Sequence, residues 1–253
     1  MTSYDTDLAA QVRDLEERLR EAERIKDEFI SRITHELRTP LSSIHGYVEV
    51  LADPDLPAEA REQFLQRIQR NSDRLLALVD DMLLAAQAGA GGGAYHRRPA
   101  DLSGLATAAV EQHEPLIAAK GLSVTVETGA PVLAEVDAVR LGQALDRLIR
   151  NAVKFTDSGT IAVGAGVRDG RAELWVRDTG AGIHPCDRAR VLAPFRRSAA
   201  AERAEVQGAG LGLTIVKAIV DGHEGALRID GEPGLGTTVT IDLPASLHPA
   251  DRW

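Results

Sequence analysis

The sequence predicts an α+β protein in which long helices come first and a mixed layer of strands and helices follows. Two observations point to this class. Up to about residue 88, apolar residues recur at helical spacing, whereas after a glycine-rich segment the pattern changes to short strands between shorter helices. We therefore expect a coiled coil, then a helical hairpin, then a two-layer α/β sandwich.

Length and composition exclude several classes of protein. The chain has 253 residues, 44% hydrophobic and 26% charged, which suffices for one or two globular domains. A net charge of -9 without a basic run argues against a nucleic-acid surface. The most apolar stretch, residues 75–86, is split by Asp80 and Asp81, so we expect no membrane span. Because Cys186 is the single cysteine, no intrachain disulfide can form, and we expect a soluble cytoplasmic protein.

The first helical segment has the seam of a coiled coil over residues 1–28 and slightly beyond. Its seam residues are spaced alternately four and three residues apart, with charged residues on the flanks. The apolar stripe shifts in phase near His35 and continues along the same helix. We expect this signalling helix to run directly into the next region. The seam consists of Leu8, Val12, Leu15, Leu19, Ala22, Lys26, Phe29 and Ile33.

A second amphipathic helix follows a break at residues 53–57, where two prolines interrupt the pattern. Its apolar stripe is wider than one partner helix could cover. Two such helices in a hairpin leave apolar surface uncovered, so we expect residues 29–88 to form a homodimeric four-helix bundle. The alternative is a monomeric hairpin that the rest of the chain covers.

The glycine-rich segment 89–94 predicts a flexible linker, followed by a domain over residues 95–245 and a tail over 246–253. Strands mixed with helices that gather together predict a two-layer sandwich for this domain. The predicted helices are residues 101–120, 137–155 and 211–221. The predicted strands are residues 122–127, 132–136, 160–167, 172–177, 226–229 and 237–243.

A histidine lies on the polar face of the first long helix. His35 falls almost opposite the apolar stripe, Glu36 adjoins it, and Thr39 lies one turn further along the same face. Pro40 cannot donate to the carbonyl of Glu36, so we expect the helix to bend just past the histidine. An exposed imidazole beside a carboxylate and a bend looks like a nucleophile on a flexible support. For His35 taken alone, a solvated surface histidine is the alternative.

Two segments of the second half offer groups suited to a nucleotide. The helix 137–155 ends near Asn151, a neutral oxygen ligand suited to Mg²⁺ when phosphates complete its shell. Lys154 could meet phosphate and Phe155 could pack near a base, although an ordinary helix C-terminus would look the same. After a predicted strand, the carboxylate of Asp178 can accept a hydrogen bond from an amino group such as that of adenine.

Glycines at two places would let a ligand come close to the backbone. Gly180 and Gly182 after Asp178 would let a flat ring approach the backbone, although a turn that ends a strand would look the same. A charged segment begins near Phe195, and the turn at residues 208–212 opens a helix whose amides suit a phosphate chain. We exclude a dinucleotide-binding Rossmann fold, because no strand-turn-helix unit with a following acidic residue surrounds these glycines.

Together these motifs resemble one family. The string His-Glu-Leu-Arg-Thr-Pro-Leu at 35–41 resembles the phosphoacceptor box of the bacterial sensor histidine kinases of two-component systems. The order of the Asn151, Asp178, Phe195 and glycine-turn segments is similar to the N, G1, F and G2 boxes of their catalytic domain. Residues 234–238 are similar to its final glycine motif. The resemblance covers residues 7–244 and implies a fold like that of the gyrase and heat-shock-chaperone ATPases.

The resemblance also implies a function. His35 would take the γ-phosphoryl group of ATP, Glu36 would receive the imidazole proton, and Thr39 would orient water for dephosphorylating a response regulator. The phosphoryl group would pass to an aspartate of that regulator's receiver domain, with ATP and Mg²⁺ as cofactors. The implied nucleotide-binding residues are Asn151 (also the Mg²⁺ ligand), Lys154, Phe155, Asp178, Gly180, Gly182, Phe195, Gly208, Gly210, Leu211, Gly212 and Thr238.

One position departs from the family's pattern. Where a second Asn commonly stands one turn before the metal-binding Asn, this chain has Arg147, which could repel Mg²⁺ or contact a phosphate. A kinase-weak member that acts mainly as a phosphatase or scaffold is therefore the alternative function. A coiled-coil interaction protein would leave the second half unexplained, and a serine kinase of the same superfamily would not need His35. The input signal would come from a separate sensor protein at the N-terminal helix, unless the chain is a shortened piece.

Overall fold

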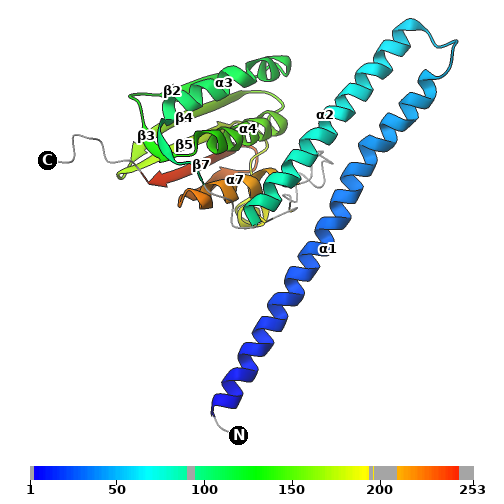
Figure 1. The fold of residues 1–253 in the computed structure, drawn as a ribbon. Helices are drawn as coiled ribbons and strands as arrows, with labels where there is room; N and C mark the ends of the chain where they lie inside the picture. The colour runs from blue at the N-terminus through cyan, green and yellow to red at the C-terminus, as the bar shows by residue number, and fades with distance from the viewer. Residues whose placement is uncertain (1–2, 90–94, 194–195, 197–209, 245–253) are drawn as a thin grey trace. The chain divides into compact units, whose positions relative to one another are not determined.

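The computed structural model describes residues 3–89, 95–193, 196 and 210–244. The chain divides into two units, residues 1–79 and 80–253. The first consists of long helices, and the second holds the end of one of these helices together with the strands and shorter helices (Figure 1). This confirms the predicted α+β class. The linker prediction, from residue 90 onward, and the predicted tail at 246–253 lie outside the described residues.

Two helices, α1 (Ser3–Leu51) and α2 (Ala58–Gly89), form the predicted hairpin. Arg61 closes the turn between them, because its guanidinium donates to the carbonyls of Leu51 and Asp53, each at 3.2 Å. These bonds satisfy carbonyl groups that the end of a helix leaves without partners. Helix α1 continues through Pro40 without a break, so the bend expected there stays a prediction.

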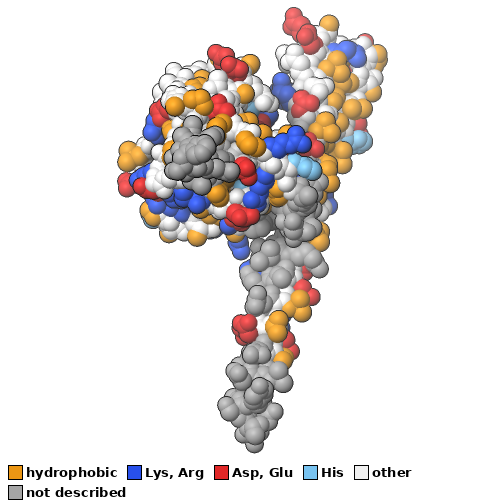
Figure 2. All heavy atoms as spheres, turned by 60° about the vertical axis from the view of Figure 1, so that its left-hand side comes forward, with side chains coloured by type: hydrophobic (Ala, Val, Ile, Leu, Met, Phe, Trp, Pro, Cys, Tyr) orange, Lys and Arg blue, Asp and Glu red, His pale blue; other side chains and the backbone are white. Residues whose placement is uncertain are grey.

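The hairpin buries some apolar side chains and leaves many others on its surface. Ile33 is 6% exposed and Leu78 is 8% exposed, and the rings of Tyr47 and Phe64 lie 5.6 Å apart. Figure 2 shows hydrophobic side chains along the surface of the helices. An exposed apolar row of this extent is typical of a surface that another helix pair covers. Its large members are Val12, Leu15, Leu19, Ile30, Leu41, Val48, Val50, Leu65, Leu76 and Val79.

The coiled-coil pairing itself stays a prediction. Helix α1 covers the whole predicted seam, as expected for a signalling helix that runs into the hairpin. The side chains of Leu8, Ala22, Lys26 and Phe29 lie outside the described residues, and the described seam residues Val12, Leu15 and Leu19 are exposed.

The second unit is built on a five-stranded sheet with the order β2-β4-β5-β7-β6. Strands β2 and β4 pair in parallel, and the other neighbours pair antiparallel. A separate antiparallel pair joins β1 to β3. The strands are β1 (Arg98–Asp101), β2 (Ser123–Thr128), β3 (Leu133–Val136), β4 (Thr160–Arg168), β5 (Arg171–Asp178), β6 (Ala226–Glu232) and β7 (Gly236–Pro244).

Three helices cover one face of the sheet and make the second layer (Figure 1). They are α3 (Leu102–Ala119), α4 (Ala138–Phe155) and α7 (Gly212–Gly222). Asp101 and Asp137 start the first two helices, because their carboxylates accept from the backbone N–H groups of Ser103 and Arg140. Alternate residues of β5 face the helices, and the wholly buried core includes Leu102, Leu141, Leu145, Leu174, Ile215, Ile241 and Leu243.

Every helix and strand predicted for this domain is present, with bounds that differ by one to three residues. Three short elements were not predicted: β1, the 3-10 helix η1 (Pro185–Asp187) and α5 (Arg188–Val191). Strand β1 contains Pro99 and shows no alternation of apolar and polar residues, so its sequence lacks the signal of a strand. It exists because its backbone pairs with β3.

Candidate active site

The predicted phosphoacceptor residues lie on one exposed stretch of α1. The side chain of His35 is exposed, and the hydroxyl of Thr39 donates to the backbone carbonyl of His35 at 3.2 Å. Glu36 is held from α2, because the guanidinium of Arg74 donates to its Oε2 at 3.0 Å. The Glu36 side chain is 25% exposed and that of Arg74 is 29% exposed, so water screens this ion pair only in part. Sequence reasoning missed Arg74, since nothing in a single helix pattern indicates a cross-hairpin partner.

In the second unit, Asn151 faces the start of α7. A methyl group placed on Gly212 would lie 3.4 Å from the side-chain amide of Asn151, so only a small residue keeps the two helices this close. The N-cap of α7 is Leu211, which provides no side-chain hydrogen bond to the first turn. Among the described residues no side chain caps these amides, which suit an anion, and Asn151 offers an oxygen beside them. Gly210 precedes them with φ +73.

Asp178 ends β5 as a buried carboxylate with one oxygen engaged. Its Oδ1 accepts from the backbone N–H of Gly180 at 2.9 Å and from that of Thr237 at 3.2 Å. Within the described part of the chain, nothing donates to its Oδ2. Burial raises the pKa of Asp178, although the two backbone N–H groups oppose that rise. The second oxygen is therefore an acceptor suited to an amino group of a flat ring.

The turn after Asp178 is locked to its neighbours by close backbone contacts. Gly180 packs against the end of α4, because a methyl group there would lie 2.2 Å from the carbonyl oxygen of Phe155. Gly182 has φ +71, and a methyl group on it would lie 1.9 Å from the carbonyl oxygen of Glu232. Gly236 has φ +92 and would place a methyl group 1.9 Å from the carbonyl oxygen of Asp178. No larger residue fits at these positions without a backbone shift.

Sequence reasoning did not name Thr237, which lies beside Asp178. Thr237 pairs with Asp178 in the register of β5 and β7, and paired residues share a face. Thr238 is the next residue and lies on the opposite face, and its role at the nucleotide stays a prediction. The structure brings Thr237 to Asp178, because its backbone N–H donates to Oδ1. The alternation of Thr237 with the buried Val239 and Ile241 is a sequence signal that could have found it.

Lys154 and Phe155 lie together at the C-terminal end of α4. The Lys154 ammonium lies 5.0 Å from the centre of the Phe155 ring, and both side chains are half-buried. Lys120 completes this helix end, because its ammonium donates to the carbonyl of Val153 at 2.7 Å. Leu211, predicted as a nucleotide residue, is 1% exposed and packs in the core. Phe195 and Gly208 lie outside the described residues.

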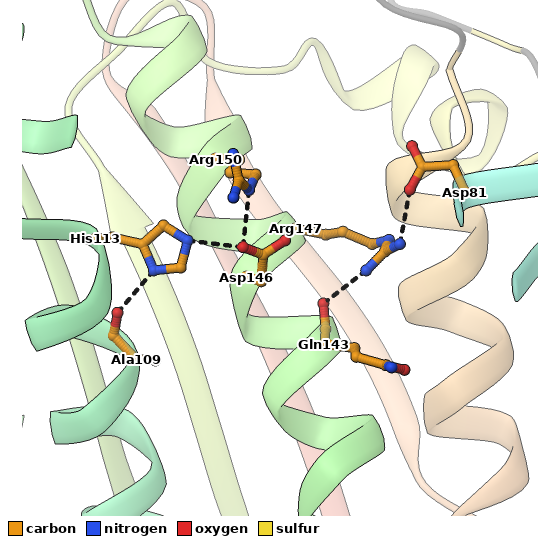
Figure 3. Close-up of polar contacts among 7 residues, drawn as sticks. All are labelled: Asp81, Ala109, His113, Gln143, Asp146, Arg147 and Arg150. Atoms are coloured by element: carbon orange, nitrogen blue, oxygen red, sulfur yellow. Dashed lines mark hydrogen bonds and ion pairs between the residues drawn. The ribbon is translucent and has the colours of Figure 1, made fainter. Parts of the chain in front are cut away.

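Arg147, one turn before Asn151, is held by α2 (Figure 3). Its Nη2 donates to Oδ1 of Asp81 at 2.7 Å, and its Nη1 donates to the carbonyl of Gln143 at 3.1 Å. Burial raises the pKa of Asp81, and the charge and hydrogen bond of Arg147 oppose that rise. Neither role expected for Arg147 from the sequence, repulsion of Mg²⁺ or contact with phosphate, included this partner.

A second ion pair, between the buried His113 and the partly buried Asp146, joins α3 to α4 next to Arg147 (Figure 3). The ring of His113 contacts the carbonyl of Ala109 through Nδ1 and Oδ1 of Asp146 through Nε2, both at 2.8 Å. Both partners are acceptors, so the ring donates from both nitrogens and carries a positive charge. The hydrogen bond to Asp146 raises the pKa of His113 against the effect of burial. Burial would raise the pKa of Asp146, yet the bonds from His113 and Arg150 hold it below its ordinary value.

The described residues contain no cluster of three or more His, Cys, Asp or Glu side chains that could hold a metal ion alone. The donor set nevertheless fits a magnesium ion that arrives with a nucleotide, because Asn151 would supply one oxygen and the phosphates the others. A resident, protein-enclosed metal site does not fit.

Comparisons with known proteins agree with this geometry. Residues 136–247 match the family described as Histidine kinase-, DNA gyrase B-, and HSP90-like ATPase. Residues 25–91 match the His Kinase A (phospho-acceptor) domain, which includes His35. The chain belongs to the sensor histidine kinases of two-component systems.

Individual histidine kinases show the same relationship. The chain is 33% identical over 233 residues to the Autoinducer 2 sensor kinase/phosphatase LuxQ of Vibrio cholerae, covering 90% of this chain and 27% of LuxQ. It is 32% identical over 238 residues to the Phosphate regulon sensor protein PhoR of Pseudomonas aeruginosa, covering 93% and 54%. The crystal structure of full-length ShkA in complex with AMPPNP is 33% identical, with a TM-score of 0.63, over 87% of this chain and 46% of ShkA.

The chain thus spans about a quarter to about a half of the curated histidine kinases that it matches. In this chain the matched domains are the phospho-acceptor domain and the ATPase-type domain. In the described ranges, none of the helices combines the length and the apolar character that crossing a lipid bilayer requires.

Proposed function

We propose that this chain is an ATP-dependent protein-histidine kinase that phosphorylates its own His35. The observation that carries the proposal is the pairing of Asn151 with the uncapped N-terminus of α7. A polyphosphate fits there because helix N-terminal amides bind anions and Asn151 can ligate the accompanying Mg²⁺. The ion would neutralise charge on the transferring phosphoryl group.

The base of the nucleotide would bind at Asp178. Its Oδ2 would accept a hydrogen bond from the exocyclic amino group of adenine, and Gly180 and Gly182 would leave room for the ring beside the backbone. The backbone N–H groups of Gly180 and Thr237 both donate to Oδ1, which leaves Oδ2 for the ligand. ShkA, a relative at 33% identity, is seen in complex with the ATP analogue AMPPNP, which supports the same ligand here.

The phosphoryl group would bond to a ring nitrogen of His35 as the bond to ADP breaks. Glu36 would accept the hydrogen bond of the other ring nitrogen and the proton that the ring loses. The exposed position of His35 supports this role, because the acceptor has to meet a second domain. Thr39 would orient water when the kinase dephosphorylates its regulator, a role supported by LuxQ's description as a sensor kinase/phosphatase.

The partners we propose are a second copy of the chain and a response regulator. The exposed apolar row of the hairpin would be buried in a four-helix bundle of two chains, as the phospho-acceptor domain of the family implies. The phosphohistidine would pass its phosphoryl group to an aspartate of the regulator's receiver domain. The cytoplasmic location, the separate sensor protein at the N-terminal helix and the domain bounds stay predictions.

Autophosphorylation with γ-labelled ATP and Mg²⁺ tests the proposal. We expect label that is acid-labile and base-stable on the native chain, and none on His35→Gln. His45→Gln is the matched control, because His45 is an exposed histidine of the same helix and should leave labelling intact. Absence of label on a native chain that binds ATP would contradict the kinase and favour the phosphatase or scaffold alternative.

A further inference from the structure

An ion pair between Asp81 and Arg147 joins α2 to α4. Arg147 lies four residues, about one helical turn, before Asn151 on α4. In the structure the Arg147 side chain is 11% exposed and extends from α4 to Asp81, whose side chain is 30% exposed, so the pair is partly buried (Figure 3). An ion pair withdrawn from water to this degree interacts more strongly than a surface pair, and water screens it less.

The bonds of Arg147 direct its guanidinium toward α2. One terminal nitrogen donates to Asp81 and the other to the carbonyl of Gln143. Its Nε–H is buried without a partner among the described atoms, as is Oε1 of Gln143. The positive charge of Arg147 is therefore already paired with a carboxylate, at 2.7 Å.

Stability alone is a poor explanation for the pair. Withdrawing two charges from water costs free energy that the attraction offsets only when the remaining polar atoms are satisfied, and the Nε–H of Arg147 is not. An apolar contact between the two helices would hold them at lower cost. What the ion pair adds is a fixed register between one point of α2 and one point of α4.

Helix α2 makes a second charged contact closer to the hairpin turn. Arg74 holds Glu36, the residue beside His35, and it lies seven residues before Asp81 in the same continuous helix. Seven residues correspond to about 10 Å of helix rise. Helix α2 thus carries two charged contacts, one with Glu36 within the first unit and one with Arg147 within the second.

We propose that the Asp81–Arg147 pair is a positioning device for phosphoryl transfer, which fixes α4, and with it Asn151, to the end of α2. The inference rests on the proposed kinase function. Arg147 acts through Asn151 and the orientation of α4, without touching the nucleotide. A small displacement of a positioned reactant lowers the rate of the chemical step much more than it lowers affinity.

The test compares the native full chain with three variants: Asp81→Asn, Arg147→Gln and the exchanged pair Asp81→Arg/Arg147→Asp. We expect each single variant to lower the rate of His35 phosphorylation at saturating ATP about tenfold. The dissociation constants of ATP and Mg²⁺ should change by less than about twofold, and the exchanged pair should recover most of the rate. Asp80→Asn and Arg150→Gln remove the same charges from neighbouring positions and should stay near the native rate.

Three outcomes would overturn the inference. A weaker affinity for ATP or Mg²⁺ in Arg147→Gln, without recovery in the exchanged pair, would show that Arg147 acts on the nucleotide itself. Faster labelling in both single variants would show that the contact restrains the kinase. Equal loss of rate in Arg150→Gln would reduce the effect to loss of positive charge near Asn151.

A readout independent of catalysis separates this inference from the proposed function. Amide hydrogen exchange over residues 80–89 should accelerate in Asp81→Asn, because the end of α2 loses its charged contact with α4. Asp81→Asn keeps the shape of the side chain, and its melting temperature shows whether the chain is folded. If His35 of the native chain is never phosphorylated, the proposed function fails. Unchanged amide hydrogen exchange in Asp81→Asn would separately contradict the role of the Asp81–Arg147 pair in holding α2 to α4.

Discussion

The backbone N–H of Asp137 donates to Nε2 of His223 at 2.9 Å, which joins the start of α4 to the end of α7. The other ring nitrogen donates to the carbonyl of Ile219 at 2.7 Å, so the two contacts define one neutral tautomer. His223 is 2% exposed, and burial lowers its pKa. The two helices that flank the nucleotide site are thus joined through a histidine that has to stay uncharged.

Acid should therefore loosen this junction. The unfolded chain binds a proton at His223 near pH 6.5, whereas the folded chain resists it, so stability contributed by His223 is present above about pH 6.5 and is lost as the pH falls. We expect His223→Ala to lower the free energy of unfolding by about 3 kcal/mol at pH 7.5, since it also leaves the Asp137 N–H unpaired. Thermal unfolding between pH 5 and 8 measures both effects. His45→Ala, an exposed change, should shift stability by less than about 0.5 kcal/mol.

His113 should show the opposite dependence on pH. Because its folded pKa is raised by Asp146, the stability that it contributes is fully present below about pH 6.5 and is lost as the pH rises through the folded value. Asp146→Asn should lower stability at pH 6 by about 1 to 3 kcal/mol and flatten the slope between pH 6 and 9. Equal slopes in the native chain and in Asp146→Asn would contradict a charged His113.

Substitution at Gly236 should disrupt the adenine-side turn. A methyl group there would meet the carbonyl oxygen of Asp178 and would sit at φ +92. We expect Gly236→Ala to abolish ATP binding, either through a displaced Asp178 or through a destabilisation of more than about 3 kcal/mol. Gly142→Ala is the control, because that helical glycine has open space around it and alanine should stabilise the helix by up to about 1 kcal/mol. Native ATP affinity in Gly236→Ala would contradict the close packing.

The apolar row on the hairpin predicts a homodimer in solution. Leu76 is 65% exposed and Leu65 is 53% exposed, so a charged residue at either position costs the single chain little but would be unfavourable in a bundle. We expect the native chain to have twice the monomer mass by light scattering and Leu76→Asp to shift toward the monomer. Leu116→Asp, on α3 of the second unit and 42% exposed, should leave the mass unchanged. A monomeric native chain would favour the alternative of a hairpin that does not dimerise.

Local patterns predicted the two long helices of the hairpin and the longer helices and strands of the second unit. The helical repeat extends over both long helices, and the strands with buried alternate residues, such as β5, carry a period of two. The residues Asn151, Asp178 and Gly212 were identifiable because they sit in short motifs at the ends of these elements. Strand β1 was missed because its pairing with β3 is not encoded in its own four residues.

Contacts between distant segments could not be predicted in the same way. Arg74 with Glu36, Asp81 with Arg147, and His113 with Asp146 join residues that no local period relates. Thr237 was not named for a different reason, since neighbouring residues of a strand lie on opposite faces and a register error of one residue exchanges them. Sequence patterns therefore named candidate site residues at the ends of elements, whereas the ion pairs around them depend on tertiary structure.

The ring of Trp175 lies against Gly164, where a methyl group would come within 2.4 Å of it, on the face of the sheet turned away from the helices. The chain has two tryptophans, and the other is Trp253 at the C-terminus. Trp253→Phe would leave Trp175 as the one tryptophan of the chain, on the face of the sheet opposite the helices. The fluorescence of Trp175 would change when the sheet opens during denaturation and stay constant during titration with ATP. Tryptophan fluorescence would therefore distinguish unfolding from ligand binding in the same sample.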